Sequence, residues 1–386
     1  MVAHPPARGT RPANRRELVL AAAAELFHRR GYSNVSMKDI ADDVAIGPSA
    51  LYRHFRNKND LLEAVVSDGL TTVEKVLDIA RRDPTMDLYA PLAAAMLGHR
   101  AIGVLWHREA RHLTQPAQRD LRDQIRAICS QISATLQHNR PELDPTQADF
   151  LAWSMLGAAT SVSFHTVTTP VELLTTLLQT VADAQIPPLR ARGGSVNESA
   201  TMWSPSRREA IVSAAIRLFA ARGYADVSLE EIGTAVGIAG PSVYNHFSTK
   251  ADILNLAMDR GNEILRADMH RDIGRAISAD DAMRRLVASY RDFALENSNL
   301  ITLLNSETGQ LPQDDRRRVR AVQRQYIAEW MQLTRQVRPE IDDTEARIRV
   351  QAALNTMNDI ATTPHLCRLD GLGPAVDAVC ATLLQP

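Results

Sequence analysis

Two short clusters of hydrogen-bonding side chains carry the most specific chemistry in this sequence. They read Tyr52-Arg53-His54 and Tyr244-Asn245-His246. An arginine pairs with the O6 and N7 atoms of guanine, whereas an asparagine pairs with the N6 and N7 atoms of adenine. Such side chains on one exposed helix face are typical of a helix that reads base edges in the major groove of DNA.

A second segment is dense in titratable side chains, but its spacing does not favour catalysis. The segment 99–112 contains His99, His107, Glu109 and His112. His107 and His112 are five residues apart, which does not place both on one helical face. The sequence also lacks the metalloprotease, phosphate-loop and nucleophile-elbow patterns. We therefore expect no enzyme, no metal site and no cofactor.

The two reading clusters belong to a long internal repeat. The segment 15–66 recurs without a gap at 207–258, with about 20 of about 50 positions identical and an offset of 192 residues. Solenoid repeats usually have a period of about 20–50 residues, so this repeat is a duplicated domain. A weaker similarity between NRPELDPTQA (139–148) and VRPEIDDTEA (337–346) indicates that each whole half is duplicated.

Each copy has the helix boundaries of a helix-turn-helix. In the first copy, Gly31 ends an amphipathic helix at a position where φ can be positive. Ser36 is then expected to cap a second helix, with Asp39 completing a capping box. In the second copy, Ser228 and Glu231 have the same roles.

A tight turn is expected before the third helix of each copy. Glycine is favoured at its first position, which holds Gly237 in the second copy but Ala45 in the first. In the third helix, Leu51 and Phe55 are expected to point inward. The reading cluster then points outward, and Lys58 at the next helix start is positioned to contact phosphate.

Length and composition indicate a helical protein with two halves. The 386 residues carry a net charge of −1, and long segments have helical periodicity. Beyond the helix-turn-helix motifs, helices are expected at 60–81, 86–105, 117–139, 145–167, 171–185, 251–275, 280–297, 312–337, 343–363 and 372–384. The expected domains are a flexible basic arm (1–14), a DNA-binding domain (15–59), a regulatory domain (60–186), a linker (187–206), a second DNA-binding domain (207–251) and a second regulatory domain (252–386).

Cysteine usage and hydropathy bear on the compartment. Three scattered cysteines are too few for a disulfide framework, and we expect free thiols in a reducing cytoplasm. No apolar run reaches the ~18 residues of a membrane span. The N-terminal segment has basic residues but no apolar stretch of a secretory signal, so we expect none.

The motif resembles the TetR family of bacterial transcriptional repressors. It stands here as DIADDVAIGPSALYRHFRNK and EIGTAVGIAGPSVYNHFSTK. The resemblance implies an all-α fold in which each half has an N-terminal helix-turn-helix and a C-terminal bundle for ligand sensing and dimerisation. It also implies contacts with a double-stranded DNA operator from Pro48, Ser49, Ala50, Tyr52, Arg53, His54 and Lys58, and from Gly240, Pro241, Ser242, Tyr244, Asn245, His246 and Lys250.

The two reading heads are not equivalent. Residues 1–60 hold ten basic and six acidic side chains, whereas residues 207–252 hold five of each. Arg53 favours guanine where Asn245 favours adenine. We therefore expect a non-palindromic operator, and a larger loss of binding without Arg53 and Lys58 than without Asn245 and Lys250. The tyrosines and histidines of both clusters have an alternative role, which is to pack against the first helix.

The regulatory halves give weaker signals. By the resemblance, a small molecule enters each helical bundle, and its binding moves the recognition helices apart. Pocket candidates are Met96, Leu97, Trp106, Phe150, Trp153, Met155 and Phe164 in the first half, and Tyr290, Phe293, Trp330, Met331 and Met357 in the second; each is also an ordinary core residue by type. Arg108, Arg111, Arg119 and Arg122 either form a solvated face or the rim of a pocket for an acidic ligand such as an acyl-CoA.

Two readings of the assembly stay open. The small residues at 155–159, with the segment 343–363, are candidates to join the two halves into a pseudo-dimer within one chain. Such a chain acts as a ligand-responsive repressor with both heads on one operator, and a further homodimer is compatible with it. In the alternative, the first head alone binds DNA and the second half is a protein-interaction module.

Overall fold

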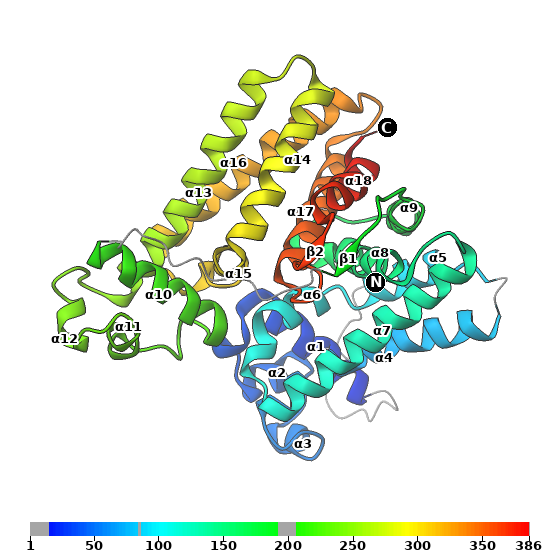
Figure 1. The fold of residues 1–386 in the computed structure, drawn as a ribbon. Coiled ribbons are helices and arrows are strands. Elements are labelled where there is room, and N and C mark those ends of the chain that lie inside the picture. The colour runs from blue at the N-terminus through cyan, green and yellow to red at the C-terminus, as the bar shows by residue number, and fades with distance from the viewer. Residues whose placement is uncertain (1–14, 84–85, 192–205, 386) are drawn as a thin grey trace. The chain divides into compact units, whose positions relative to one another are not determined.

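The protein is helical almost throughout (Figure 1), which confirms the all-α fold expected from the sequence. The structure, a computed structural model, describes residues 15–83, 86–191 and 206–385. The expected basic arm (1–14) and most of the expected linker (187–206) lie outside these residues. None of the described helices is both long and apolar enough to cross a membrane.

The first half contains nine α-helices among the described residues, joined by short helical turns. They are α1 (Arg15–Arg30), α2 (Met37–Asp43), α3 (Pro48–Tyr52), α4 (Lys58–Arg82), α5 (Tyr89–Gly98), α6 (Ile102–Val104), α7 (Gln115–Asn139), α8 (Pro145–Thr160) and α9 (Val171–Ala182). The turns are η1 (Tyr32–Asn34), η2 (Leu105–Glu109), η3 (Ala110–His112) and η4 (Ser161–Phe164), of which η2 is a π-helical turn. The strand β1 (Arg190–Ala191) follows α9.

The second half repeats this order of elements. Its helices are α10 (Arg207–Arg222), α11 (Leu229–Ala235), α12 (Gly240–Val243), α13 (Lys250–Arg275), α14 (Ala279–Glu296), α15 (Ser298–Ser306), α16 (Gln313–Val337), α17 (Asp343–Thr362) and α18 (Leu372–Leu384). The turn η5 (Thr308–Gln310) precedes α16, and the strand β2 (Leu369–Asp370) precedes α18. Because α7 and α16 start 198 residues apart, the duplication is visible in the helices as well as in the sequence.

Three helix boundaries differ from those expected. The segment 86–105 is not one helix, because α5 ends at Gly98 and the chain turns before α6 begins at Ile102. Glycine at that position weakens the helix, since it lacks a side chain and gains backbone freedom when it unfolds. The helix expected at 145–167 ends earlier, at Thr160. The helix α15 was not expected, and Asn297 separates it from α14 without any proline or glycine signal.

The chain folds into two compact units whose division does not follow the repeat. Unit 1 holds the described residues up to Leu143 and the segment Ala159–Gln179. Unit 2 holds Asp144–Ala158 and the described residues from Thr180 onward. Most of α8, a first-half helix, therefore belongs to the same unit as the whole second half. The domain boundaries drawn from the sequence stay a prediction.

Helix α17 forms the centre of unit 2. Its side chains are buried almost all round, including the polar Gln351, Asn355 and Asn358. A helix that is buried on all sides lies inside a core and does not cover its surface. Within unit 2, β1 also pairs antiparallel with β2, so that Arg190 lies opposite Asp370. Residues of both sequence halves thus share one core.

Candidate nucleic-acid interface

The first helix-turn-helix is built by short-range signals. Gly31 has a φ of 81°, which ends α1 and would strain any residue with a side chain. Ser36 accepts a hydrogen bond from the Asp39 amide at 3.1 Å, and the Asp39 carboxylate accepts one from the Ser36 amide at 2.7 Å. This reciprocal pair confirms the expected capping box and starts α2 at Met37. The pair also lowers the pKa of the Asp39 carboxyl.

The second helix-turn-helix has the same capping interactions, with a glutamate in place of the aspartate. Ser228 and Glu231 form the expected capping box at the start of α11. Hydrogen bonds from the Ser228 amide and from Arg222 lower the pKa of Glu231 to about 2. The Arg222 guanidinium lies 2.6 Å from the Glu231 carboxylate, so this cap also carries an ion pair.

The two turns have the same conformation but different residues. Gly237 has a φ of 70° and Ala45 has a φ of 54°. In each turn the next amide donates a hydrogen bond to the preceding helix. The Ile46 amide donates to Ala41 O in α2 at 2.9 Å, and the Ile238 amide donates to Gly233 O in α11 at 2.9 Å. Alanine in this region costs about 1–2 kcal/mol. The first head therefore carries backbone strain that the second head avoids.

The third helices expose the residues expected to read DNA. In α3, Leu51 is fully buried whereas Tyr52 is 52% exposed, and Arg53 and His54 are exposed beside it. Helix α12 ends at the buried Val243, and Tyr244, directly after it, is 60% exposed. The third helices are thus shorter than expected, and the rest of each reading cluster follows their last turn. Both tyrosines thus point into solvent, which disfavours the alternative that they pack against the first helix. The histidines differ, because His54 is exposed and His246 is only half-buried.

The remaining candidates lie at the start of the third helices. Pro48, Ser49 and Pro241 are exposed there, whereas Ala50, Gly240 and Ser242 are partly covered. The structure thus presents two comparable faces, α3 and α12, each after a capped helix. The DNA contacts of these residues stay predictions.

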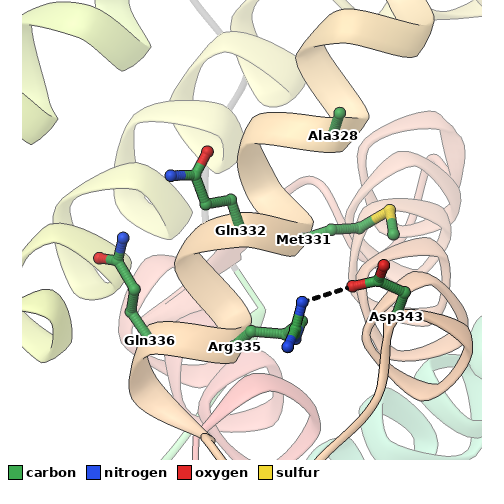
Figure 2. A pocket seen from close by; sticks show the side chains of 6 residues that line it. All are labelled: Ala328, Met331, Gln332, Arg335, Gln336 and Asp343. Carbon is green, nitrogen blue, oxygen red and sulfur yellow. Dashed lines mark hydrogen bonds and ion pairs between the residues drawn. The ribbon is translucent and has the colours of Figure 1, made fainter.

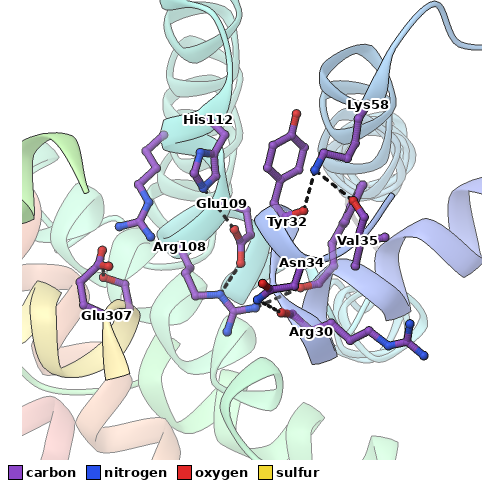
Figure 3. Close-up of polar contacts among 12 residues, drawn as sticks. Arg30, Tyr32, Asn34, Val35, Lys58, Arg108, Glu109, His112 and Glu307 are labelled. Carbon is purple, nitrogen blue, oxygen red and sulfur yellow. Dashed lines mark hydrogen bonds and ion pairs between the residues drawn. The ribbon is translucent and has the colours of Figure 1, made fainter. Parts of the chain in front are cut away.

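Lys58 and Lys250 have a role that the sequence did not reveal. The Lys58 ammonium donates hydrogen bonds to Tyr32 O and Val35 O, both at 2.9 Å, and lies 4.1 Å from the centre of the Tyr32 ring (Figure 3). Lys250 makes the equivalent contacts with Tyr224 O and Val227 O at 2.6 and 2.7 Å. Burial lowers the pKa of both ammonium groups. Each lysine therefore ties the start of α4 or α13 to the turn after the first helix, whether or not it also contacts phosphate.

The cationic side chains of the second head are largely engaged within that head. Arg207 donates to Val236 O at 2.9 Å, and Arg208 donates to His246 O at 2.6 Å while lying over the Phe247 ring. Glu230 covers the start of α12, because a Cβ on Gly240 would lie 2.6 Å from Glu230 Cγ. The first head has the exposed Lys38 at the position of Glu230. The charge at this position of the second helix is therefore opposite in the two heads.

A polar junction joins the first head to the helices that follow it. Arg108 in η2 donates to Phe27 O and His28 O at 3.1 and 2.8 Å, and also pairs with the buried carboxylate of Glu109 (Figure 3). The His112 ring stacks on Tyr32 with 4.9 Å between the ring centres. The stack and the Arg108 hydrogen bonds both reach the C-terminal end of α1.

The dense cluster at 99–112 therefore serves structure in this region, and no His/Cys/Asp/Glu group suited to a metal occurs among the described residues. In the second half the corresponding positions, 198 residues later, hold Ser306 in place of Arg108 and Gln310 in place of His112. Glu307 is kept and is as deeply buried as Glu109. The sequence signal for this junction was the unusual density of charged side chains before α7.

The pocket candidates are mostly core residues. Met96, Phe150 and Trp330 are fully buried, and Tyr290 and Phe293 are nearly so, whereas Trp106 and Trp153 are partly exposed. Met96 and Trp106 belong to unit 1, and Phe150 and Trp153 belong to unit 2, where Trp153 packs edge-on against His365. That the first set lines a ligand pocket stays a prediction.

Two residues of the second set, Tyr290 and Trp330, lie in one aromatic cluster. Tyr290 lies 6.0 Å from Trp330 between ring centres, and its hydroxyl donates to Asn358 Oδ1 at 2.9 Å. Tyr326, which the sequence reasoning missed, completes the cluster 6.3 Å from Tyr290. Burial raises the pKa of Tyr290 to about 12, so its hydroxyl stays protonated as a donor. The helical periodicity of α16 could have identified Tyr326, because it lies four residues before Trp330 on the same face.

A separate, open pocket of about 430 Å³ lies on α16 beside the start of α17 (Figure 2). It is lined by Ala328, Met331, Gln332, Arg335, Gln336 and Asp343. The Arg335 guanidinium pairs with Asp343 at 2.7 Å, and both side chains are at least half exposed. Ligand sites are usually enclosed, whereas this pocket is open to solvent. Of the sequence candidates, Met331 lines it.

Comparisons with known proteins agree with the two reading heads. A family model described as "Bacterial regulatory proteins, tetR family" matches residues 19–65 and again residues 211–257. A model described as "Tetracyclin repressor-like, C-terminal domain" matches residues 276–362. Both reading clusters thus lie inside matched segments.

Curated relatives match over short segments. The chain is 31% identical over 117 residues to the HTH-type transcriptional repressor KstR2 of Mycolicibacterium smegmatis, a match that covers 29% of this chain and 57% of that protein. It is 41% identical over 51 residues to the HTH-type transcriptional regulator UidR of Escherichia coli, covering 13% of this chain and 26% of that protein. The matched part is thus less than two thirds of either relative.

Among solved structures, a TetR-family transcriptional regulator from Bordetella parapertussis is similar to part of the chain. The two share 20% sequence identity at a TM-score of 0.40, over 42% of this chain and 84% of that chain.

Proposed function

Because the chain is a tandem TetR-like protein that carries the family's DNA-binding domain twice, we propose that it is a transcriptional regulator that binds a double-stranded DNA operator through α3 and α12. The observation that carries this proposal is the exposed Tyr52-Arg53-His54 cluster at the end of α3, in a capped helix-turn-helix, and its repetition from Tyr244 onward just after α12. Repression is the expected outcome, as for the relative named a repressor. The site of action is then the cytoplasm.

The operator is not a palindrome in this proposal. The Arg53 guanidinium offers two parallel donors to guanine, whereas the Asn245 amide offers one donor and one acceptor to adenine. Both side chains are exposed at equivalent positions of the repeat, just after α3 and α12. Each bidentate pair is worth about 1–3 kcal/mol of discrimination against a wrong base, so the two half-sites differ in sequence.

The two heads act together as a pseudo-dimer within one chain. Support comes from unit 2, where α8 of the first half packs against α17 of the second. Asn355 donates to Gly157 O at 2.7 Å, and Thr356 donates to Ser154 O at 3.4 Å. The packing of α8 against α17 then replaces the seam between two separate subunits. The length of the DNA footprint also shows whether two such chains associate on longer DNA.

A small effector controls DNA binding in this proposal. The buried aromatic cluster of Tyr290, Tyr326 and Trp330 suits a small apolar molecule, and an acyl-CoA-like ligand fits if cationic side chains also contact it. The Arg108 junction supplies a route from the first bundle to the first head, because it joins η2 to the end of α1. A ligand that shifts η2 would therefore shift α1 and, through it, α3.

The second candidate function uses the first head alone. Glu230 beside α12 and the internal hydrogen bonds of Arg207 and Arg208 favour it, because they weaken the attraction of the second head to phosphate. The second half would then serve as a protein-interaction module.

Footprinting with methylation interference tests the two functions together. Two working heads should protect two unlike half-sites about one helical turn apart, near 34–36 Å from centre to centre. Protection of a single half-site would favour the second function. Absence of any sequence-specific protection would overturn both.

A further inference from the structure

The helices α8 and α17 are equivalent elements of the duplication. The last four residues of NRPELDPTQA form the start of α8, and the last four of VRPEIDDTEA form the start of α17, with an offset of 198 residues. No gap separates these segments from the helices, so each residue of α8 corresponds to the residue 198 positions later in α17. Gly157 therefore corresponds to Asn355, and Ala158 corresponds to Thr356.

The hydrogen bond between Asn355 and Gly157 joins two such equivalent positions. Asn355 Nδ2 donates to Gly157 O at 2.7 Å, and the two residues are 198 apart in sequence. When two related helices cross, the axis that relates them passes where a residue contacts its own equivalent. The approximate two-fold axis of this pair therefore passes between Gly157 and Asn355.

The two sides of this axis are complementary and unlike. A Cβ on Gly157 would lie 3.0 Å from Thr356 Cα and 3.3 Å from Thr356 Oγ1, so the backbones meet with room for hydrogen alone. Asn355 is 5% exposed and fills the other side. One side thus offers a carbonyl without a side chain, and the other offers an amide that reaches it.

Pairing of two α8 helices, or of two α17 helices, would lose this fit. Two α17 helices would bring Asn355 against a second Asn355, where the observed spacing leaves no room for a Cβ. Two α8 helices would bring Gly157 against a second Gly157 and leave unfilled the space that the Asn355 side chain occupies. Overpacked cores and voids both destabilise.

We propose that the Gly157–Asn355 pair selects the partner of each half, so that α8 accepts α17 and rejects a second α8, and α17 accepts α8 and rejects a second α17. A buried polar residue that specifies pairing is a known use of such groups. The proposal rests on the proposed pseudo-dimer and deepens it, because every assembled molecule then presents one first head and one second head. The core, and not the linker, then prevents two identical heads from pairing on a palindromic operator.

Exchange of residues across the axis is the decisive test. In the full chain, G157N should lower the Tm by about 5 °C or more, because its Cβ meets Thr356, and N355G should lower the Tm by less. The exchange variant G157N/A158T/N355G/T356A moves both corresponding pairs across the axis. The asparagine then faces alanine in place of threonine, and most of the loss should be recovered. If G157N does not fold, recovery of a folded exchange variant carries the same result. An exchange variant whose Tm is no higher than that of G157N/N355G, or that does not fold, would overturn the proposal.

Selectivity has its own measurement. Two full-length chains with different affinity tags are co-expressed, once as wild type and once with N355G in both. N355G places glycine on both sides of the axis and should raise the fraction of chains captured with a partner at least two-fold over wild type. Equal capture would overturn the selectivity.

Neither readout involves DNA, so failure of the proposed operator binding is distinguishable. If the chain gives no sequence-specific footprint while the exchange variants behave as expected, only the proposed function is refuted. The reverse pattern would refute the pairing rule alone.

Discussion

Arg108 donates a hydrogen bond to the main-chain oxygen of His28 at 2.8 Å, across 80 residues of sequence. The same guanidinium binds the buried carboxylate of Glu109. The end of the first helix is therefore fixed to a turn of the regulatory helices in unit 1 by one side chain. No equivalent arginine exists at the corresponding position of the second half, which holds Ser306.

Loss of Arg108 should weaken both stability and the first head. R108A removes two hydrogen bonds from the end of α1 and leaves the Glu109 carboxylate, which is 3% exposed, without its nearest cation. We expect a loss of about 1–3 kcal/mol in the free energy of unfolding and weaker protection of the half-site read by the first head. R126A is the matched control, since its ion pair with Asp123 is mostly exposed and worth less than about 1 kcal/mol. Equal effects of the two variants in thermal unfolding and footprinting would contradict the role of the junction.

Arg53 and Asn245 should make unequal contributions to DNA binding. R53A should weaken binding by about 1–3 kcal/mol and relax the preference for guanine at one position. N245A should weaken binding less, because the asparagine contributes no charge near the phosphates. Gel-shift titrations at one fixed salt concentration, with each half-site substituted in turn, measure both effects. Equal losses would argue against the asymmetry of the heads.

Glu230 should oppose DNA binding by the second head. E230K places a cation beside the start of α12, so we expect tighter binding and a salt slope steeper by about 1. The reciprocal variant K38E should weaken the first head by the same mechanism. Titrations at several salt concentrations give both slopes. If E230K leaves affinity and slope unchanged, the second head does not approach phosphate at this position, as the single-head function requires.

The strain at Ala45 should be relieved by glycine. Ala45 has a φ of 54°, so A45G should stabilise the first head by about 1 kcal/mol. The mirror variant G237A should destabilise the second head by a similar amount. A Cβ on Gly237 would meet nothing within 4 Å, so its cost comes from the backbone alone. Urea unfolding of both variants measures the two changes, and changes of the same sign would refute this interpretation.

The cap at Glu231 should make the second head sensitive to acid. Hydrogen bonds lower the pKa of Glu231 in the folded state to about 2, from 4.5. A carboxyl with a depressed pKa stabilises the fold fully above its unfolded pKa, and this stabilisation is lost as the pH falls from about 4.5 toward 2. E231Q should remove that part of the pH dependence. Melting curves of wild type and E231Q over this pH range provide the measurement, and parallel curves would exclude the effect.

The helix-turn-helix could be predicted closely from the sequence because its signals are local. Capping boxes, positive-φ glycines and the spacing of Leu51 and Phe55 all act within a few residues, and the structure confirms them. The exposure of Tyr52 follows from the same helical periodicity. These features depend on residues that are close together in sequence, so they can be predicted without the tertiary structure.

Other features could not be predicted, since they depend on which surfaces meet. The hydrogen bonds from the Lys58 ammonium to Tyr32 O and Val35 O join residues more than twenty positions apart, whereas the phosphate contact expected of Lys58 stays a prediction. The break at Gly98 and the helix α15 depend in the same way on how their neighbours pack. Local propensity carries too little free energy to decide such boundaries against tertiary contacts.

The sequence by itself determined the duplication, the helical fold and the difference between Arg53 and Asn245. Only the tertiary structure showed that α8 shares a core with the second half, and that Asn355 reaches the carbonyl of its own equivalent, Gly157. A repeat reveals which residues correspond, because correspondence is a property of the order of the chain. Whether corresponding residues touch depends on close packing between segments far apart in sequence, where one missing Cβ allows the contact.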